Sequence, residues 1–179
     1  VACGTGDLAL AFAATPAASV LGVDFAPNML ARAEQKRLAA PPGAAKTRFE
    51  VADATALPLA AASVDVVSIA FGIRNVGEPG KALTEFARVL RPGGRLIVLE
   101  FTEPENPIVR WGNNLYAGRV MPLTATMLSG DKSGAYKYLP ASVKTFLTRA
   151  QMEAAISDAG FSDVISTPLT LGICACYRG

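Results

Sequence analysis

A glycine turn followed by a carboxylate is the part of this 179-residue chain best suited to chemistry. Gly4-Thr5-Gly6 stands between a strand end and a helix start, and Asp24 follows 20 residues after Gly4. Glycines let a ligand approach the backbone, and the N–H groups of a helix start point at it. An aspartate at this spacing can accept hydrogen bonds from ribose hydroxyls. The pattern therefore predicts a nucleotide-containing cofactor.

The glycine pattern alone leaves the kind of cofactor open. Gly4, Gly6 and Ala9 also satisfy the loose Gly-x-Gly-x-x-Gly/Ala pattern of dinucleotide enzymes, so an NAD-dependent oxidoreductase is an alternative. It is disfavoured because the chain has no Tyr-x-x-x-Lys base motif; Tyr136 and Lys137 are adjacent. A tight turn without any ligand is a further alternative.

A second carboxylate, Asp53, ends the strand expected at 47–51, on the same carboxyl edge as Asp24. A carboxylate and a backbone N–H at Asp53 and Ala54 can read the edge of an adenine. The alternative is an aspartate that caps a helix or stabilises a turn, which is a common use of this residue.

Composition excludes several classes of site. The chain has no His, which excludes histidine general bases, histidine metal sites and Ser-His-Asp triads, and we expect no metal. A net charge of +2 gives no argument for nucleic acid. Three Cys, an odd number, indicate a reducing, cytoplasmic setting rather than a disulfide framework. No apolar run reaches the roughly 18 residues of a spanning helix.

Short apolar runs alternate with helical stretches, which predicts an α/β fold with a doubly wound, mostly parallel sheet and an antiparallel C-terminal hairpin. Helices are expected at 7–14, 27–39, 79–90 and 148–159. Strands are expected at 19–24, 47–51, 64–71, 95–101, 161–166 and 169–177. Residues 91–94 are predicted to be a turn, Pro168 to lie in the hairpin turn, and the 64–71 strand to be buried on both faces.

Residues 1–179 are expected to form a single domain, with 104–148 a lid-like insertion. In such a sheet the strand that leads into the first glycine loop is central, yet only Val1-Ala2 stand before Cys3. A central strand cannot be omitted without leaving ladder groups unpaired. We therefore expect the first strand to be largely missing and the chain to be an N-terminally truncated fragment that folds poorly alone.

Several stretches together resemble a known family. They are Val1-Ala2-Cys3-Gly4-Thr5-Gly6-Asp7, Val23-Asp24, Asp53-Ala54, Phe71-Gly72-Ile73-Arg74-Asn75-Val76, Leu90-Arg91-Pro92-Gly93-Gly94-Arg95-Leu96, Leu99-Glu100-Phe101, Tyr136-Lys137-Tyr138-Leu139 and Ala159-Gly160-Phe161. The chain resembles the ubiquinone/menaquinone biosynthesis C-methyltransferases, most specifically at 71–76. The resemblance implies a Rossmann-like fold that uses S-adenosylmethionine (SAM) to methylate a prenylated hydroquinone. The acceptor would be demethylmenaquinol, 2-methoxy-6-polyprenyl-benzoquinol, or both.

The resemblance also implies roles for single residues. Gly4, Thr5 and Gly6 would line the methionine and ribose of SAM. Asp24 would hold the ribose hydroxyls, and Asp53 with Ala54 the adenine.

The catalytic candidates are Arg74 and Asn75. A ring carbon of the acceptor becomes nucleophilic only when a phenolic hydroxyl, with a pKa of about 10, loses its proton. Arg74 would favour the phenolate as a fixed positive charge, and Asn75 would orient the ring or a water. The resemblance also suggests a proton relay through water. The alternative is that Arg74 caps a strand end and pairs with Glu78.

The insertion carries weaker signals about partners. Tyr116, Tyr136 and Tyr138 are candidates for the wall of a quinol pocket. Six basic residues and one acidic residue lie between 107 and 149. Because a prenylated quinol resides in the bilayer, this segment is a candidate for peripheral contact with anionic headgroups at the inner face of the membrane, with an ordinary solvated face as the alternative. A homodimer is compatible with the sequence.

Two other functions stay open at this point. One is a SAM methyltransferase for another small acceptor, in which Arg74 would be dispensable. The other is a non-catalytic module that binds SAM and transfers no methyl group.

Overall fold

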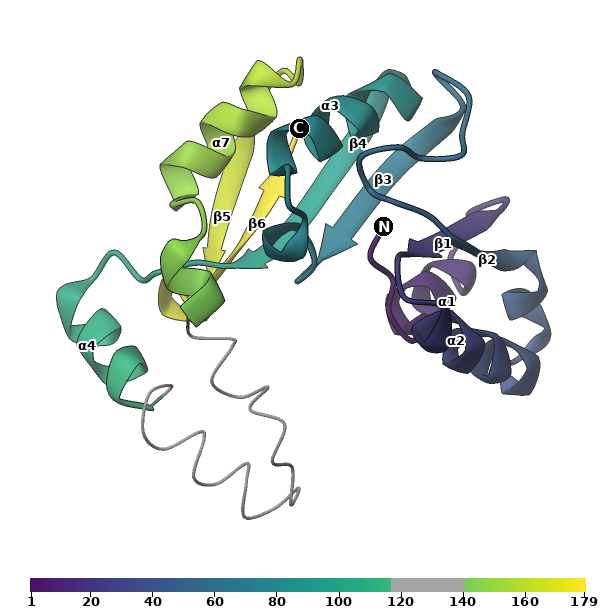
Figure 1. Cartoon of the computed structure of the whole chain (residues 1–179), viewed down its shortest axis with the longest axis horizontal. Coiled ribbons are helices and arrows are strands. Elements are labelled where there is room, and N and C mark those ends of the chain that lie inside the picture. Colours follow the sequence, from purple (N-terminus) through teal and green to yellow (C-terminus); the bar gives the residue numbers. More distant parts are fainter. Residues whose placement is uncertain (117–140) are drawn as a thin grey trace. The chain divides into compact units, whose positions relative to one another are not determined.

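The computed structural model describes residues 1–116 and 141–179, and it divides into two compact units, 1–98 and 99–179 (Figure 1). Unit 1 contains α1 (Asp7–Ala13), β1 (Val20–Asp24), α2 (Pro27–Ala39), η1 (Pro42–Lys46), β2 (Thr47–Val51), β3 (Val64–Ala70), η2 (Ile73–Asn75), α3 (Pro79–Val89) and most of β4 (Leu90–Phe101). Unit 2 contains the end of β4, α4 (Pro107–Leu115), α7 (Arg149–Asp158), β5 (Ile165–Leu169), η4 (Thr170–Gly172) and β6 (Cys174–Arg178).

In unit 1, β1 and β2 form a parallel pair in which Val20 lies opposite Thr47 and Asp24 opposite Val51. Pro27 begins α2 at the first helical position, where its missing N–H costs no hydrogen bond. Because the two strands run in the same direction, both end at one edge. That edge carries Asp24 and the residues that lead to Asp53, as the sequence predicts.

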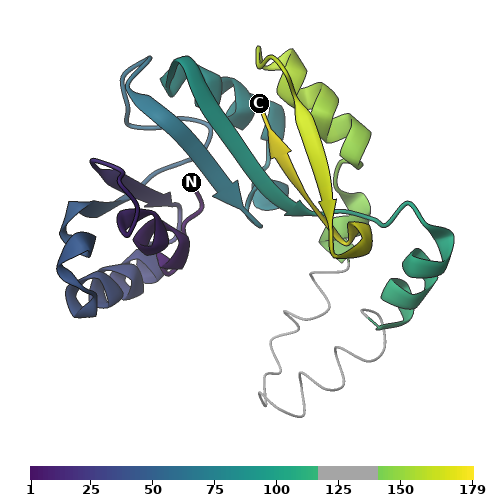
Figure 2. The same cartoon turned by 180° about the vertical axis from the view of Figure 1, so that it is seen from behind.

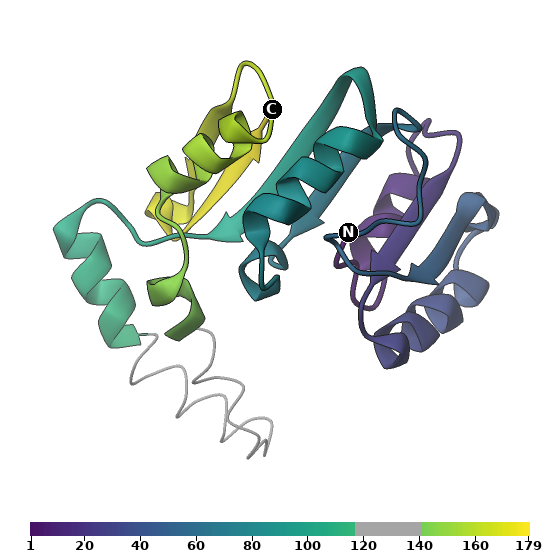
Figure 3. The same ribbon diagram turned by 45° about the horizontal axis from the view of Figure 1, so that its top comes forward.

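The other strands of unit 1 are β3 and its neighbour β4, with α3 lying along them (Figure 3). The buried stripe of α3 is Ala82, Leu83, Phe86 and Val89, all fully buried. Only Val67 and Ile69 of β3 are buried and Val66 is 54% exposed, so the prediction of burial on both faces is wrong for the first half of this strand.

The predicted turn at 91–94 is also wrong, because β4 begins at Leu90, directly after α3. Gly93 accommodates the local backbone with φ 78°, which a glycine adopts without steric cost. Arg91 Nη1 lies 2.5 Å from Asp65 Oδ1 and ties this early part of β4 to the start of β3.

Residues 1–3 connect β1 with β3. The Cys3 N–H donates to the carbonyl of Val23 at 3.0 Å, and the Val1 amine donates to the carbonyl of Ser68 at 2.7 Å. The Val1 amine therefore contacts β3, and the Cys3 N–H contacts β1. A cavity of about 380 Å³ lies beside this segment, between Val20–Gly22 and Ser68.

In unit 2, β6 lies between β4 and β5. Figure 2 shows the antiparallel hairpin of β5 and β6, whose register runs from Ile165 opposite Arg178 to Leu169 opposite Cys174. The hairpin is confirmed, but Pro168 lies within β5 opposite Ala175, and the turn is η4. A proline is tolerated there because β5 is an edge strand.

The N-terminus of α7 has a capping box, in which Thr148 and Gln151 satisfy each other's backbone N–H groups. Met152 and Ile156 of this helix are fully buried. Gly160 follows the helix with φ 99°, as expected for the residue after a helix end.

Across 1–116 and 141–179, no helix is long and apolar enough to cross a membrane.

Candidate cofactor and catalytic site

Two glycines shape the loop after Cys3. Gly4 and Gly6 take φ values of 55° and 83°, in the left-handed region that favours glycine. A Cβ at Gly4 would meet no atom within 4 Å, so this part of the loop is open to a ligand. A Cβ at Gly6 would lie 2.7 Å from the ring of Phe49 and 2.9 Å from Cβ of Ala33. Gly6 therefore allows the loop to pack closely against β2 and α2.

The Asp24 carboxylate connects the glycine loop with α2. Its Oδ2 accepts the Gly4 N–H at 2.7 Å, and its Oδ1 accepts the Ala26 N–H at 2.9 Å. Each carboxylate oxygen can accept more than one hydrogen bond. The ribose hydroxyls of a nucleotide therefore fit this carboxylate, beside the open face of Gly4.

Asp53 lies at the same strand edge. The Ala52 N–H donates to the carbonyl of Asp24 at 3.1 Å and joins the ends of β1 and β2. The Asp53 Oδ1 accepts the Thr55 backbone N–H at 2.8 Å and the Thr55 hydroxyl at 2.9 Å, and these bonds lower the pKa of the Asp53 carboxyl. In these contacts Asp53 is a turn residue, the alternative that the sequence allowed. An adenine contact by Asp53 and Ala54 stays a prediction.

Thr5 belongs to a polar cluster that sequence reasoning missed. The Thr5 hydroxyl donates to Asp7 Oδ2 at 2.8 Å and accepts from Lys36 Nζ at 2.8 Å. Lys36 also contacts both oxygens of Asp7, which lowers the pKa of the Asp7 carboxyl. Lys36 comes from α2, so the cluster fixes the orientation of Thr5 relative to that helix. No spacing rule connects a lysine of α2 with the loop, and the sequence carried no signal for it.

Arg74 and Asn75 lie in η2, directly after β3. The Arg74 Nη1 donates to the carbonyl of Phe71 at 2.6 Å, and the Asn75 N–H donates to the carbonyl of Gly72 at 3.0 Å. Glu78, the partner considered for Arg74, lies 3.8 Å from Lys81 Nζ. Arg74 is half-buried and Asn75 is exposed.

The cavity of unit 1 includes one of the predicted cofactor residues. Of these residues only Gly4 lines it, while Thr5, Gly6, Asp24, Asp53 and Ala54 do not. Its walls come from residues 1–4, from α1, from the start of β1 and from the end of β3 with Phe71 directly after it. That the cofactor binds at the open loop around Gly4 and Asp24 stays a prediction.

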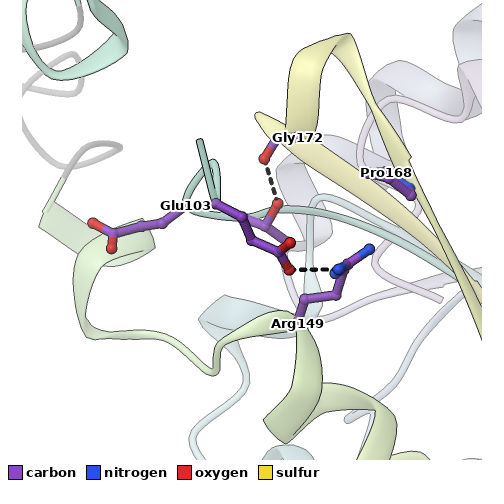
Figure 4. A pocket seen from close by; sticks show the side chains of 6 residues that line it. Glu103, Arg149, Pro168 and Gly172 are labelled. Carbon is purple, nitrogen blue, oxygen red and sulfur yellow. Dashed lines mark hydrogen bonds and ion pairs between the residues drawn. The ribbon is translucent and has the colours of Figure 1, made fainter. Parts of the chain in front are cut away.

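Unit 2 has a smaller cavity of about 100 Å³ (Figure 4). Two interactions join its lining residues. Arg149 forms an ion pair with Glu105, and the Thr102 hydroxyl donates to the carbonyl of Gly172 at 2.8 Å. The Glu103 side chain points away from Arg149. The polar groups inside are paired with each other, which makes this a structural junction. Within the described ranges, no group of three or more cysteine or carboxylate side chains could hold a metal ion.

Comparison with known proteins decides the family. The model of the ubiE/COQ5 methyltransferase family matches residues 1–179. The chain belongs to this family. It is 44% identical over 179 residues to a ubiquinone/menaquinone biosynthesis C-methyltransferase UbiE of Syntrophotalea carbinolica, covering 99% of this chain and 73% of that protein. It is 45% identical over 180 residues to a demethylmenaquinone methyltransferase of Thermus thermophilus, covering all of this chain and 80% of that protein.

Solved structures agree on the fold. A SAM-dependent methyltransferase from Aquifex aeolicus superposes with a TM-score of 0.67 at 17% identity, over 99% of this chain and 77% of that chain. The predicted Rossmann-like α/β fold is confirmed. Family membership also confirms the prediction of a SAM-dependent methyltransferase and decides against the NAD-dependent oxidoreductase.

Proposed function

We propose that the chain transfers a methyl group from SAM to a ring carbon of a prenylated hydroquinone. The acceptor is demethylmenaquinol, with 2-methoxy-6-polyprenyl-benzoquinol as a second acceptor. The observation that supports this most is the sequence identity of 39–45% to proteins named for menaquinone and ubiquinone methylation, over nearly all of the chain. The Phe71–Val76 segment, the most specific part of the resemblance, lies directly after β3.

Bound SAM supplies a methyl group that is already activated. The protein therefore has to align the two reactants and keep water away. Asp24 holds the ribose hydroxyls while its existing bonds to the Gly4 and Ala26 N–H groups keep the loop and α2 in place. Thr5 is the polar side chain of the loop, and its hydrogen bonds with Lys36 and Asp7 fix its orientation.

Arg74 stabilises the phenolate of the acceptor. A guanidinium stays protonated at every physiological pH, so it acts as a fixed positive charge rather than as a base. Its effect is to lower the pKa of the acceptor hydroxyl, which makes the ring carbon nucleophilic near neutral pH. Asn75 orients the ring or a water that receives the proton.

Two variants test these roles, and the first has a matched control. Asp24→Asn removes the charge that holds the ribose, and we expect SAM to bind about 10- to 100-fold more weakly, since hydrogen bonds to charged groups contribute about 1.5–3 kcal/mol. The control is Asp65→Asn. Asp65 is an exposed aspartate of β3 that pairs with Arg91, and this variant should bind SAM as tightly as the wild type.

For Arg74→Ala, we expect methylation of a reduced, short-chain demethylmenaquinone to fall at pH 7 and to recover partly at higher pH, where the acceptor ionises unaided. Mass spectrometry of the quinone product measures it. Full activity of this variant at pH 7, or methylation of an unrelated small acceptor alone, would contradict the proposal.

Membrane contact through 107–149 belongs to the same proposal. On α4, the apolar side chains of Ile108, Trp111 and Leu115 are 78%, 70% and 40% exposed. Positions three and four apart lie on one helix face, and aromatic and aliphatic side chains there suit a membrane interface. Tyr136 and Tyr138 lie outside the described residues, as do Arg119, Lys132 and Lys137.

We expect the protein to be cytoplasmic and to sediment with vesicles that contain anionic lipid. Trp111→Ser should reduce this sedimentation, and sedimentation independent of anionic lipid would contradict the contact. The single domain with a lid at 104–148 also stays a prediction. The homodimer stays a prediction too, and light scattering would test it by measuring the mass of the protein in solution.

A further inference from the structure

Phe71 has an unusual backbone for its residue type. It follows β3 and takes φ 55°. This value lies in the left-handed region, which residues other than Gly, Asn and Asp rarely adopt. Such a conformation persists only where surrounding contacts enforce it, and it often marks a functional segment. The Phe71 side chain is 38% exposed.

The residues after Phe71 hold this backbone in place. A Cβ at Gly72 would lie only 2.5 Å from Cβ of Ala2, so the chain at Gly72 is pressed against the residues that precede the glycine loop. Ile73 is fully buried, and the Asn75 N–H closes a turn on the carbonyl of Gly72 at 3.0 Å. The chain is therefore fixed on the C-terminal side of Phe71.

The carbonyl of Phe71 is a hydrogen-bond partner of Arg74. That carbonyl accepts the Arg74 Nη1 at 2.6 Å, a hydrogen bond between a charged donor and a neutral acceptor. We propose that Phe71 is a positioning residue for Arg74, acting through its left-handed backbone and not through its ring. The proposal rests on the role of Arg74 given above and adds the element that orients it.

Substitutions at Phe71 that differ in backbone preference test this. Phe71→Asn and Phe71→Gly accept the left-handed region, whereas Phe71→Val opposes it because the side chain is β-branched. We expect the Asn and Gly variants to keep kcat within about threefold. We expect Phe71→Val to lower kcat about tenfold, with KM for SAM unchanged. Loss of activity in all three variants would show that the ring matters and would overturn the proposal.

Ala62 offers a matched control, since it also has a left-handed backbone, with φ 50°, and is exposed. Ala62→Val imposes the same backbone conflict away from Arg74 and should leave kcat unchanged. An equal loss of kcat in Ala62→Val would mean that any such strain unsettles the fold, which also overturns the proposal. Phe71→Val combined with Arg74→Ala should be no slower than Arg74→Ala alone, because the two changes remove one contribution.

A readout without turnover separates this proposal from the role of Arg74. The guanidinium N–H signals of Arg74 in NMR should be resolved in wild type and in Phe71→Asn, and averaged in Phe71→Val. If Arg74→Ala keeps full activity, the catalytic role of Arg74 fails, and these signals still decide whether Phe71 positions it. Identical Arg74 signals in Phe71→Val and wild type would contradict the positioning.

Discussion

Cys3 lies half-buried between the start of the chain and the glycine loop, and burial raises the pKa of its thiol to about 11. At pH 8 only about one thiol in a thousand is then ionised, and only the thiolate reacts with alkylating agents. We expect alkylation of Cys3 in the folded chain to speed up about tenfold per pH unit from pH 8 to pH 10. Peptide mass spectrometry measures the rate.

The urea-unfolded chain is the control for Cys3. There the thiol regains an ordinary pKa, and the rate should level off near pH 9. If the folded chain levels off at the same pH, the thiol is not buried as described. Because Cys3 adjoins Gly4, bound SAM should slow the reaction further.

Single residues differ in how well the sequence predicts them. The location of Asp24 at a strand end follows from spacing, because one strand and one helix have nearly fixed lengths between a glycine loop and the next strand end. Its hydrogen bond from the Gly4 N–H was not predicted. The sequence correctly predicts that Asp53 lies at the carboxyl edge of the strands. Its carboxylate accepts a hydrogen bond from the Thr55 N–H. Lys36 and the backbone of Phe71 could not be predicted, since both depend on which atoms meet after folding.

At the scale of elements, Gly22 in β1 is required by close packing. A Cβ there would lie 2.6 Å from two ring atoms of Phe49 and 3.1 Å from Cys3 Sγ. Overpacking of this kind costs about 1–3 kcal/mol. We expect Gly22→Ala to lower the free energy of unfolding by that amount in urea titrations.

Gly80 is the matched control for Gly22. It lies in the first turn of α3, and a Cβ there would meet no atom within 4 Å. Alanine is favoured over glycine in helices by about 0.5–1 kcal/mol, so Gly80→Ala should stabilise the chain or leave it unchanged. Equal effects of the two substitutions would show that β1 and Phe49 are not in close contact.

Most elements followed from local signals, and the errors share one cause. Pro27, Pro79 and Thr148 marked helix starts, because each satisfies or tolerates a free helix end. The predicted turns at 91–94 and at Pro168 are strand residues instead. Glycine and proline report the local backbone, but whether a neighbouring strand is there to pair is decided by tertiary structure.

At the scale of the whole molecule, the 179-residue chain taken by itself has a buried amine at Val1, and burial of this amine makes the stability of this chain depend on pH. The amine donates to the carbonyl of Ser68, and burial lowers its pKa below 8.0, the ordinary value that it regains in the unfolded chain. Between the folded pKa and 8.0 the unfolded chain binds more protons, so stability rises with pH across this window and is constant above it. Thermal unfolding of the 179-residue chain from pH 6 to pH 9 should show this rise.

Acetylation of the Val1 amine is the control. The acetylated N–H can still donate to Ser68, but it carries no charge and does not titrate. The contribution of the Val1 amine to the pH dependence should disappear. Below pH 8 the acetylated chain should be more stable than the chain with a free amine. An unchanged pH profile would contradict a buried amine at this position.

The central claim is that the loop around Gly4 and Asp24 holds SAM in a methyltransferase of this family. Calorimetric titration of the 179-residue chain with SAM, and separately with NAD, tests it most directly. We expect the chain to bind one SAM, with binding weakened by Asp24→Asn and not by Asp65→Asn, and we expect no binding of NAD. Binding of NAD without SAM, or SAM binding that is indifferent to Asp24→Asn, would contradict it.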